Sequence, residues 1–320
     1  MLKTLTVLAG VLALQACAAG STDTGKETAQ TGVAPTRPSA NGQRVGIILA
    51  HGLAGSVDSF DPAIEAALAD DGFYVLRDAV PPVDSVAHRA AALATQVDDF
   101  VASNQLDKVH IIAHSMGGLD SRYLISTLGY ADKIASLTTL GTPHRGSPLA
   151  DIGLGIGDHV GTTAEDAILA LTDAFGLGND ITSEQLDLAL TDLAEASAPA
   201  FNAANPDAPE VAYFSYAGYS TLLGVPNIKA RGLCSSTGIK TPSPSSLPGE
   251  LNLTGPIIGG GTFRPHDGVV PIDSAEWTGF LGCIPTDHLD MTRAGAKDAD
   301  DLDLDLVSFF RSIGKRVGSL

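Results

Sequence analysis

The sequence predicts an α/β protein with a mostly parallel β-sheet flanked by helices. Short apolar runs alternate with stretches whose apolar residues recur at helical spacing, which is typical of parallel strands joined by right-handed helical crossovers. The chain also contains 35 glycines, which suit the tight turns between strands and helices. With 320 residues, of which 44% are hydrophobic, the chain is long enough to form one large domain.

Each element follows from its local pattern. Apolar runs predict strands at 45–50, 74–80, 109–113, 134–140 and 211–216. Helical spacing predicts helices at 61–70, 85–103, 115–128, 182–205 and 300–317. Between the strand at 134–140 and the helix at 182–205, residues 153–180 form a glycine-bounded insertion with an apolar stretch. This insertion is predicted to be a helical lid that opens at an oil surface; the alternative is a plain packing helix.

The folded domain is expected to span 44–320, and the residues before it form two segments. Residues 1–16 are predicted to be a lipoprotein-type signal peptide, because Lys3 precedes an apolar run, 5–14, that is too short to span a bilayer. The run leads into Leu-Gln-Ala-Cys17, which resembles the bacterial signal that is cut before a lipid-carrying cysteine. The alternative is an ordinary secretory signal that is cleaved near Ala18 or Ala19, so that Cys17 is discarded and the protein is secreted. Residues 17–43 are small and polar, which predicts a disordered tether.

These features predict export, with lipid on Cys17 anchoring the chain to the cell envelope, and the outer membrane as the expected site.

If Cys17 is lipidated or removed, Cys234 and Cys283 remain and are expected to form a disulfide in an oxidising compartment. The formal net charge of −18 argues against a nucleic-acid partner, because phosphate binding needs clustered Lys and Arg.

The most informative motif is Ala113-His-Ser115-Met116-Gly117, which follows the strand at 109–113. Small residues two positions either side of a serine on a sharp strand-to-helix turn are typical of a nucleophile elbow. The Met116 N–H would lie at a helix N-terminus, where it can stabilise an oxyanion. The alternative role for Ser115 is a helix N-cap.

A second oxyanion donor is predicted after the strand at 45–50, where the chain turns at His51-Gly52-Leu53. The Leu53 N–H would pair with that of Met116. His51 and His114 are interpreted as structural residues that hold these two loops.

Chain order selects the remaining residues, since this kind of site runs Ser, then acid, then His. Of the eight histidines, only His266 and His288 follow Ser115 at sufficient distance and outside the insertion. His288, on a late loop, is the predicted base. Asp267, on a turn before an apolar strand, is the predicted acid, with Asp273 as the second choice.

Together these motifs resemble the bacterial true lipases of the Pseudomonas and Burkholderia type, within the α/β-hydrolase superfamily. The matching segments are 51–53, 113–118, 141–147, 267–270 and 288–290. The resemblance implies an α/β-hydrolase fold with a helical lid, and a Ser–His–Asp esterase of long-chain acylglycerols.

The family also binds a structural calcium ion near the histidine, and many members need a foldase partner. Asp290 matches one calcium ligand, but Ala294 stands where a side-chain amide is expected. No cofactor is therefore predicted, and Asp290 is kept as the calcium candidate.

The predicted function is a triacylglycerol lipase that acts through Ser115, Asp267 and His288 and binds an ester or lipid substrate. One alternative is a short-chain esterase or polyhydroxyalkanoate depolymerase with the same triad. Another is a non-catalytic, lipid-binding surface lipoprotein.

Overall fold

The computed structural model describes residues 32–35, 42–156, 163, 181–220, 258, 264–292 and 305–320. Within these residues, six strands form one sheet in the order β2-β1-β3-β4-β5-β6, and every neighbouring pair is parallel. The strands are β1 (Val45–Ala50), β2 (Tyr74–Arg77), β3 (Lys108–His114), β4 (Ile134–Leu140), β5 (Ala212–Gly218) and β6 (Phe280–Ile284).

The strand order reverses at β1, which pairs with β2 on one side and β3 on the other. In open parallel sheets, ligands bind in the crevice outside the carboxyl ends of the strands where the order reverses. The first residues beyond these ends are His51, after β1, and Ser115, after β3. The fold therefore brings the two predicted oxyanion segments to the same edge of the sheet.

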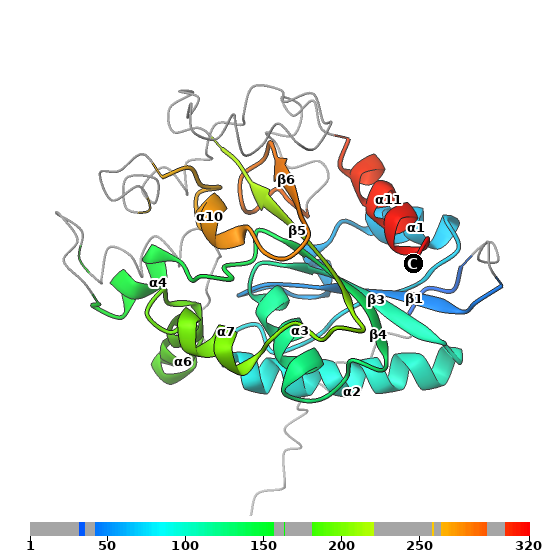
Figure 1. Ribbon diagram of the computed structural model, residues 1–320, viewed down its shortest axis with the longest axis horizontal. Coiled ribbons are helices and arrows are strands. Elements are labelled where there is room, and N and C mark those ends of the chain that lie inside the picture. Colours follow the sequence, from blue (N-terminus) through cyan, green and yellow to red (C-terminus); the bar gives the residue numbers. More distant parts are fainter. Residues whose placement is uncertain are drawn as a thin grey trace, which may run out of the picture.

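Helices of the described residues cover both faces of the sheet (Figure 1). On one face lie α2 (Val86–Asn104) and α3 (Met116–Ser126), and on the other lie α1 (Pro62–Asp70) and α11 (Leu306–Val317). Because successive strand side chains point to opposite faces, the neighbours Ile47 and Ile48 of β1 enter different cores.

Further helices gather beyond one end of the sheet, at the left of Figure 1. They are α4 (Pro148–Gly153), α6 (Ser183–Leu193), α7 (Ala198–Ala204) and α10 (Ile272–Ala275), and a short 3-10 helix, η1 (Val57–Ser59), follows β1. α4 packs against α6, and both contribute buried residues to a third core that includes Leu53 and Met116.

The predicted parallel α/β architecture is confirmed, and α2 illustrates why its helices form where the pattern places them. The Ser85 hydroxyl accepts the N–H of His88 at the N-terminus, which satisfies one of the helix's free donors. At the other end, Gln105 adopts a left-handed conformation with φ of 52°, which stops the helix.

Several details differ from the sequence prediction, and three of them have a clear local cause. The single helix expected at 182–205 is two helices, because Ala194 leaves the helical conformation (ψ 143°) and Pro199 occupies the first turn of α7. β6 was not predicted, since it is short and contains Gly282, which has φ of 116°. The prediction of a strand after Asp267 was wrong. The N–H groups of Val269 and Val270 donate to the Asp267 carboxylate and not to a neighbouring strand.

Several predicted features lie outside the described residues: the signal peptide, most of the tether, Cys17, Cys234 and nearly all of 153–180. The domain boundaries and the lid therefore stay predictions. Across the part of the chain that the structure describes, no helix combines the length and apolar character needed to cross a membrane.

Candidate active site

Ser115 occupies the sharp turn between β3 and α3. Its φ of 53° and ψ of −129° lie in a region that residues with side chains rarely adopt. The Ser115 N–H donates to Leu140 O at 2.9 Å, and the Thr142 hydroxyl donates to Ser115 O at 2.8 Å. A side chain at Gly117 would bring its Cβ within 2.6 Å of the His51 carbonyl oxygen, so this turn requires a residue without one.

The three residues that chain order selects lie in one hydrogen-bonded row. His288 Nε2 is 2.9 Å from Ser115 Oγ, and His288 Nδ1 is 2.8 Å from Asp267 Oδ2. All three side chains are buried, and those of Asp267 and His288 are fully inaccessible. Because ionised Asp267 can only accept, Nδ1 carries the imidazole proton and Nε2 is left to accept from the serine hydroxyl.

The second oxygen of Asp267 is also occupied. Asp267 Oδ1 accepts the N–H groups of Val269 at 2.9 Å and Val270 at 2.7 Å. The backbone supports the same arrangement, since His288 N donates to Asp267 O at 2.9 Å. Hydrogen bonds to both oxygens therefore fix the orientation of the Asp267 carboxylate toward His288.

The alternative acid, Asp273, lies elsewhere. Its exposed carboxylate accepts from Arg264 Nε and pairs with Arg264 Nη2, both at 2.9 Å. The other late histidine, His266, accepts the Gly268 N–H at Nδ1 and so holds the turn that presents Asp267. The structure thus brings Asp267, and not Asp273, to His288.

The Leu53 loop packs directly against the serine, since a Cβ on Gly52 would lie 2.6 Å from Ser115 Cβ. Among the described residues, the backbone N–H groups of Leu53 and Met116 have no hydrogen-bond acceptor. Such N–H groups beside a nucleophile are what an oxyanion needs. The carbonyl of Gly52 accepts from His51 Nδ1 at 2.8 Å and from Arg89 Nη2 at 3.3 Å. Since N–H and C=O of a trans peptide point in opposite directions, these two bonds turn the Leu53 N–H away from Arg89.

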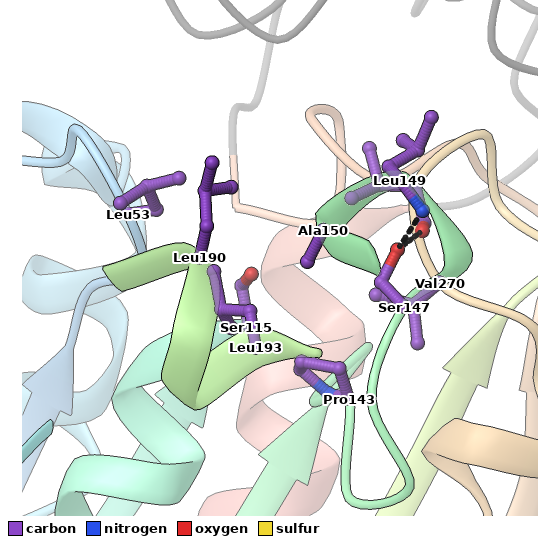
Figure 2. A pocket seen from close by; sticks show the side chains of 10 residues that line it. Leu53, Ser115, Pro143, Ser147, Leu149, Ala150, Leu190, Leu193 and Val270 are labelled. Carbon is purple, nitrogen blue, oxygen red and sulfur yellow. Dashed lines mark hydrogen bonds between the residues drawn. The ribbon is translucent and has the colours of Figure 1, made fainter. Parts of the chain in front are cut away.

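A small apolar cavity of about 20 Å³ lies over Ser115, which is room for about one water. Figure 2 shows the leucines of α6 and the α4 residues Leu149 and Ala150 around the serine. Besides Ser115, the lining contains one more polar side chain, that of Ser147. Its hydroxyl is already hydrogen-bonded, because it donates to Val269 O at 2.6 Å and accepts from Leu149 N. The cavity is lined by Leu53, Ser115, Pro143, Ser147, Leu149, Ala150, Leu190, Leu193, Val269 and Val270.

Comparison with known proteins agrees with this geometry. Residues 46–159 match the family model of the alpha/beta hydrolase fold. Triacylglycerol lipase 2 of Saccharomyces cerevisiae is 30% identical over 265 residues, which cover 80% of this chain and 68% of the yeast protein. The chain belongs to the lipase family of α/β hydrolases.

Bacterial lipases match over shorter stretches. A triacylglycerol lipase of Vibrio cholerae is 34% identical over 134 residues, which are 40% of this chain and 42% of that protein. One of Burkholderia plantarii is 37% identical over 116 residues, which are 34% of this chain and 32% of that protein. The matched segment thus spans less than half of these bacterial relatives.

Solved structures show the same fold. A metagenomic carboxyl esterase superimposes with a TM-score of 0.61 at 19% identity, covering 89% of this chain and 78% of its own. The mature lipase of Bacillus licheniformis gives a TM-score of 0.58 at 20% identity, covering 81% and 89%. At these identities the likeness concerns the fold alone.

In this lipase-family chain, Arg89 and Asp120 are site-forming residues that sequence reasoning missed. Fully buried Arg89 donates to Asp120 Oδ2 at 2.9 Å and to the carbonyls of His51 at 2.9 Å and Pro82 at 3.2 Å. Burial raises the pKa of Asp120 to about 7, while the Arg89 charge acts in the opposite direction. The sequence did contain a signal for this ion pair. Arg89 lies three residues after Val86 on the apolar stripe of α2, where a buried charge needs a partner.

The other predicted residues have mixed outcomes. Cys283 is buried and disulfide-bonded, but its predicted partner Cys234 lies outside the described residues.

Asp290 faces Asp287, and burial together with the Asp290 charge raises the pKa of Asp287 to about 8. Calcium takes six to eight oxygen ligands, and in the described ranges no group of three or more His, Cys, Asp or Glu residues could hold a metal ion. The calcium-ligand role suggested for Asp290 therefore stays a prediction.

Proposed function

We propose that this chain is a serine carboxylic ester hydrolase, most specifically a triacylglycerol lipase, with Ser115, His288 and Asp267 as its catalytic triad. The observation that carries the proposal is the continuous row from Ser115 Oγ through His288 to Asp267, with steps of 2.9 and 2.8 Å. The relatives named triacylglycerol lipases support it. The bacterial matches support the finer resemblance to the Burkholderia-type lipases.

Acylation begins when His288 Nε2 takes the proton of the Ser115 hydroxyl. The serine oxygen then attacks the ester carbonyl carbon, and the carbonyl oxygen becomes an oxyanion. The N–H groups of Leu53 and Met116 donate to that oxyanion. Asp267 remains ionised and stabilises the charged imidazole. When the tetrahedral intermediate collapses, His288 returns its proton to the leaving alcohol and the acyl group stays on Ser115.

Deacylation repeats these steps with water. His288 removes a proton from the water as it attacks the acyl carbonyl, and the same two N–H groups hold the second oxyanion. Ser115 leaves with the proton from His288, which releases the carboxylic acid and restores the starting site.

The lining of the cavity supports an aliphatic acyl chain as the substrate group. Leu149, Leu190 and Leu193 offer only apolar surface, and each buried methylene contributes about 0.8 kcal/mol. The cavity of about 20 Å³ is too small for such a chain, so this proposal requires the site to widen when a long chain enters. The sequence prediction of a lid at 153–180 fits this requirement.

The test compares wild-type protein with the Ser115→Ala variant on emulsified long-chain triglyceride, a soluble short-chain ester and polyhydroxyalkanoate. We expect wild type to hydrolyse the triglyceride best, and the variant to lose about 10⁴-fold or more in kcat on every ester. A serine-reactive phosphonate should label wild type and not the variant. Undiminished hydrolysis by Ser115→Ala contradicts the triad. Preference for the short ester or the polyester contradicts the lipase assignment, and failure of wild type to hydrolyse or label leaves the non-catalytic alternative.

We also propose that the protein is exported, anchored through lipid on Cys17, and cross-linked between Cys234 and Cys283. The signal-like start and the oxidising compartment it implies support this, as does the disulfide-bonded state of Cys283. Metabolic labelling with a fatty-acid analogue should mark the wild-type protein and not Cys17→Ala. Label on the Cys17→Ala variant would contradict the lipid anchor. Co-expression with and without a lipase foldase tests whether that partner is needed for folding.

A further inference from the structure

One contact joins the serine segment to the histidine loop directly. His114 Nε2 lies 2.8 Å from the backbone carbonyl oxygen of His288, and both residues are buried. Because a carbonyl oxygen can only accept, Nε2 of His114 must carry a proton and donate it. The two imidazole rings also touch, with centroids 4.7 Å apart and planes tilted by 45°.

The position of His114 in the chain gives this contact its importance. His114 immediately precedes Ser115, whereas His288 lies 174 residues after His114. The bond therefore ties the base to the residue beside the nucleophile, and it sets the spacing between Ser115 Oγ and His288 Nε2 independently of Asp267. Proton transfer needs a separation within hydrogen-bond reach, so a loss of this tie acts on the chemical step.

The two bonds from Asp267 hold a different part of His288. Asp267 contacts Nδ1 and the backbone N–H of His288, so both of its bonds approach from the Asp267 side. His114 holds the backbone carbonyl of His288 and packs against its ring. With it, the imidazole is held from two directions.

We propose that His114 is a positioning residue for catalysis, which holds His288 at proton-transfer distance from Ser115. This inference rests on the proposed function of the triad and adds a residue to it. His114 acts through His288 and does not itself touch the reacting atoms.

The test uses two substitutions at His114. His114→Phe keeps an aromatic ring and removes the donor. His114→Gln keeps an amide donor near the place of Nε2. We expect kcat on a soluble ester to fall about tenfold or more in His114→Phe, because the buried His288 carbonyl loses its partner. KM should change much less than kcat, and phosphonate labelling of Ser115 should slow in parallel. His114→Gln should recover most of the lost kcat.

The matched control is His110→Phe on the same strand. His110 is also buried and bonded to a neighbouring strand, with its Nδ1 2.8 Å from Ser136 Oγ, but it lies at the opposite end of β3. This control should lose stability and keep kcat at neutral to alkaline pH. Unfolding midpoints of all variants separate loss of fold from loss of rate.

The outcomes are distinct. Wild-type kcat in folded His114→Phe, or a loss in His114→Gln as large as in His114→Phe, overturns the positioning role and leaves the triad intact. Equal kcat losses in His110→Phe and His114→Phe also overturn it, since the effect is then general to β3. Inactive wild-type protein with unlabelled Ser115 overturns the proposed function instead.

Discussion

Arg89 and Asp120 form a buried ion pair that links the two segments of the proposed oxyanion site. Arg89 Nε donates to Asp120 Oδ2 at 2.9 Å, and the side chains are 0% and 2% exposed. Asp120 lies on α3, the helix whose N-terminus supplies the Met116 N–H. Arg89 in turn holds the carbonyls of His51 and Gly52, and so the loop that presents Leu53. One guanidinium therefore fixes the separation of the two N–H donors.

Substituting Arg89 with lysine tests this link. Lysine keeps the charge and loses the planar fork that reaches several carbonyls at once. Removing one oxyanion donor costs about 10²–10³ in rate, so displacing one should lower kcat by about tenfold to a hundredfold. KM should change little, because the donors act mainly on the transition state. Steady-state kinetics on a soluble ester measures both constants.

Arg77→Lys is the matched control for that prediction. Arg77 also pairs with a buried carboxylate, Glu65, at 2.9 Å, but it lies on β2. We expect this variant to lose stability and keep wild-type kcat. If the two lysine variants lose kcat equally, Arg89 has no specific role in the oxyanion site.

Asparagine substitutions at Asp267 and Asp273 separate the two candidate acids. Asp267→Asn places an amide beside His288 Nδ1 and selects the wrong imidazole tautomer, a change that lowers kcat about 10⁴-fold in the serine protease triad. Asp273→Asn removes an exposed ion pair with Arg264 and should leave kcat within about twofold of wild type, since such pairs contribute little. Urea unfolding of both variants establishes that each is folded before the rates are compared. A larger loss in Asp273→Asn than in Asp267→Asn contradicts the assignment of the acid.

The sequence predicted those parts of the site that follow from local pattern and chain order. The apolar run before Ser115 marks β3, and the order of serine, acid and histidine selects His288. The choice of Asp267 over Asp273 rested on the expected apolar strand, which is absent. The structure places Asp267 beside His288 for a different reason, since its own turn takes up the Val269 and Val270 N–H groups.

Other contacts could not be predicted, because they join residues that are far apart in the chain. His114 meets His288 and Arg89 meets Asp120 only after the sheet has formed. The histidine before the serine was interpreted as structural, and no local spacing relates it to a carbonyl 174 residues away. β6 was missed for another reason, because a short strand interrupted by Gly282 has weak strand propensity.

Leu190→Ala tests whether α6 forms part of the acyl-chain site. Leu190 is 1% exposed and lines the cavity over Ser115. We expect kcat/KM for a long-chain ester to fall about tenfold, because the chain loses apolar contact, and that for an acetate ester to change by less than about threefold. The variant should also be less stable by about 2–5 kcal/mol. Leu188→Ala on the same helix is the control, since Leu188 is 43% exposed. Equal losses on the two esters contradict an acyl-chain site at Leu190.

Buried His110 predicts that part of the stability is lost in acid. Burial lowers the pKa of His110 to about 4, whereas an unfolded histidine titrates near 6.5. Between these values the unfolded chain binds a proton that the folded protein does not. The free energy of unfolding therefore decreases as pH falls from about 6.5 to about 4, by about 3 kcal/mol from this residue alone.

His110→Phe removes that contribution. At pH 7.5 the variant should be less stable than wild type by about 1–3 kcal/mol, because Ser136 loses its partner. As the pH is lowered to 4.5, the deficit should shrink or reverse, since only wild type then carries the cost of keeping a histidine neutral. Urea unfolding of both proteins at the two pH values measures this difference, and the common titration of the carboxylates cancels in it. A deficit that stays constant between the two pH values shows that His110 is not held neutral by burial.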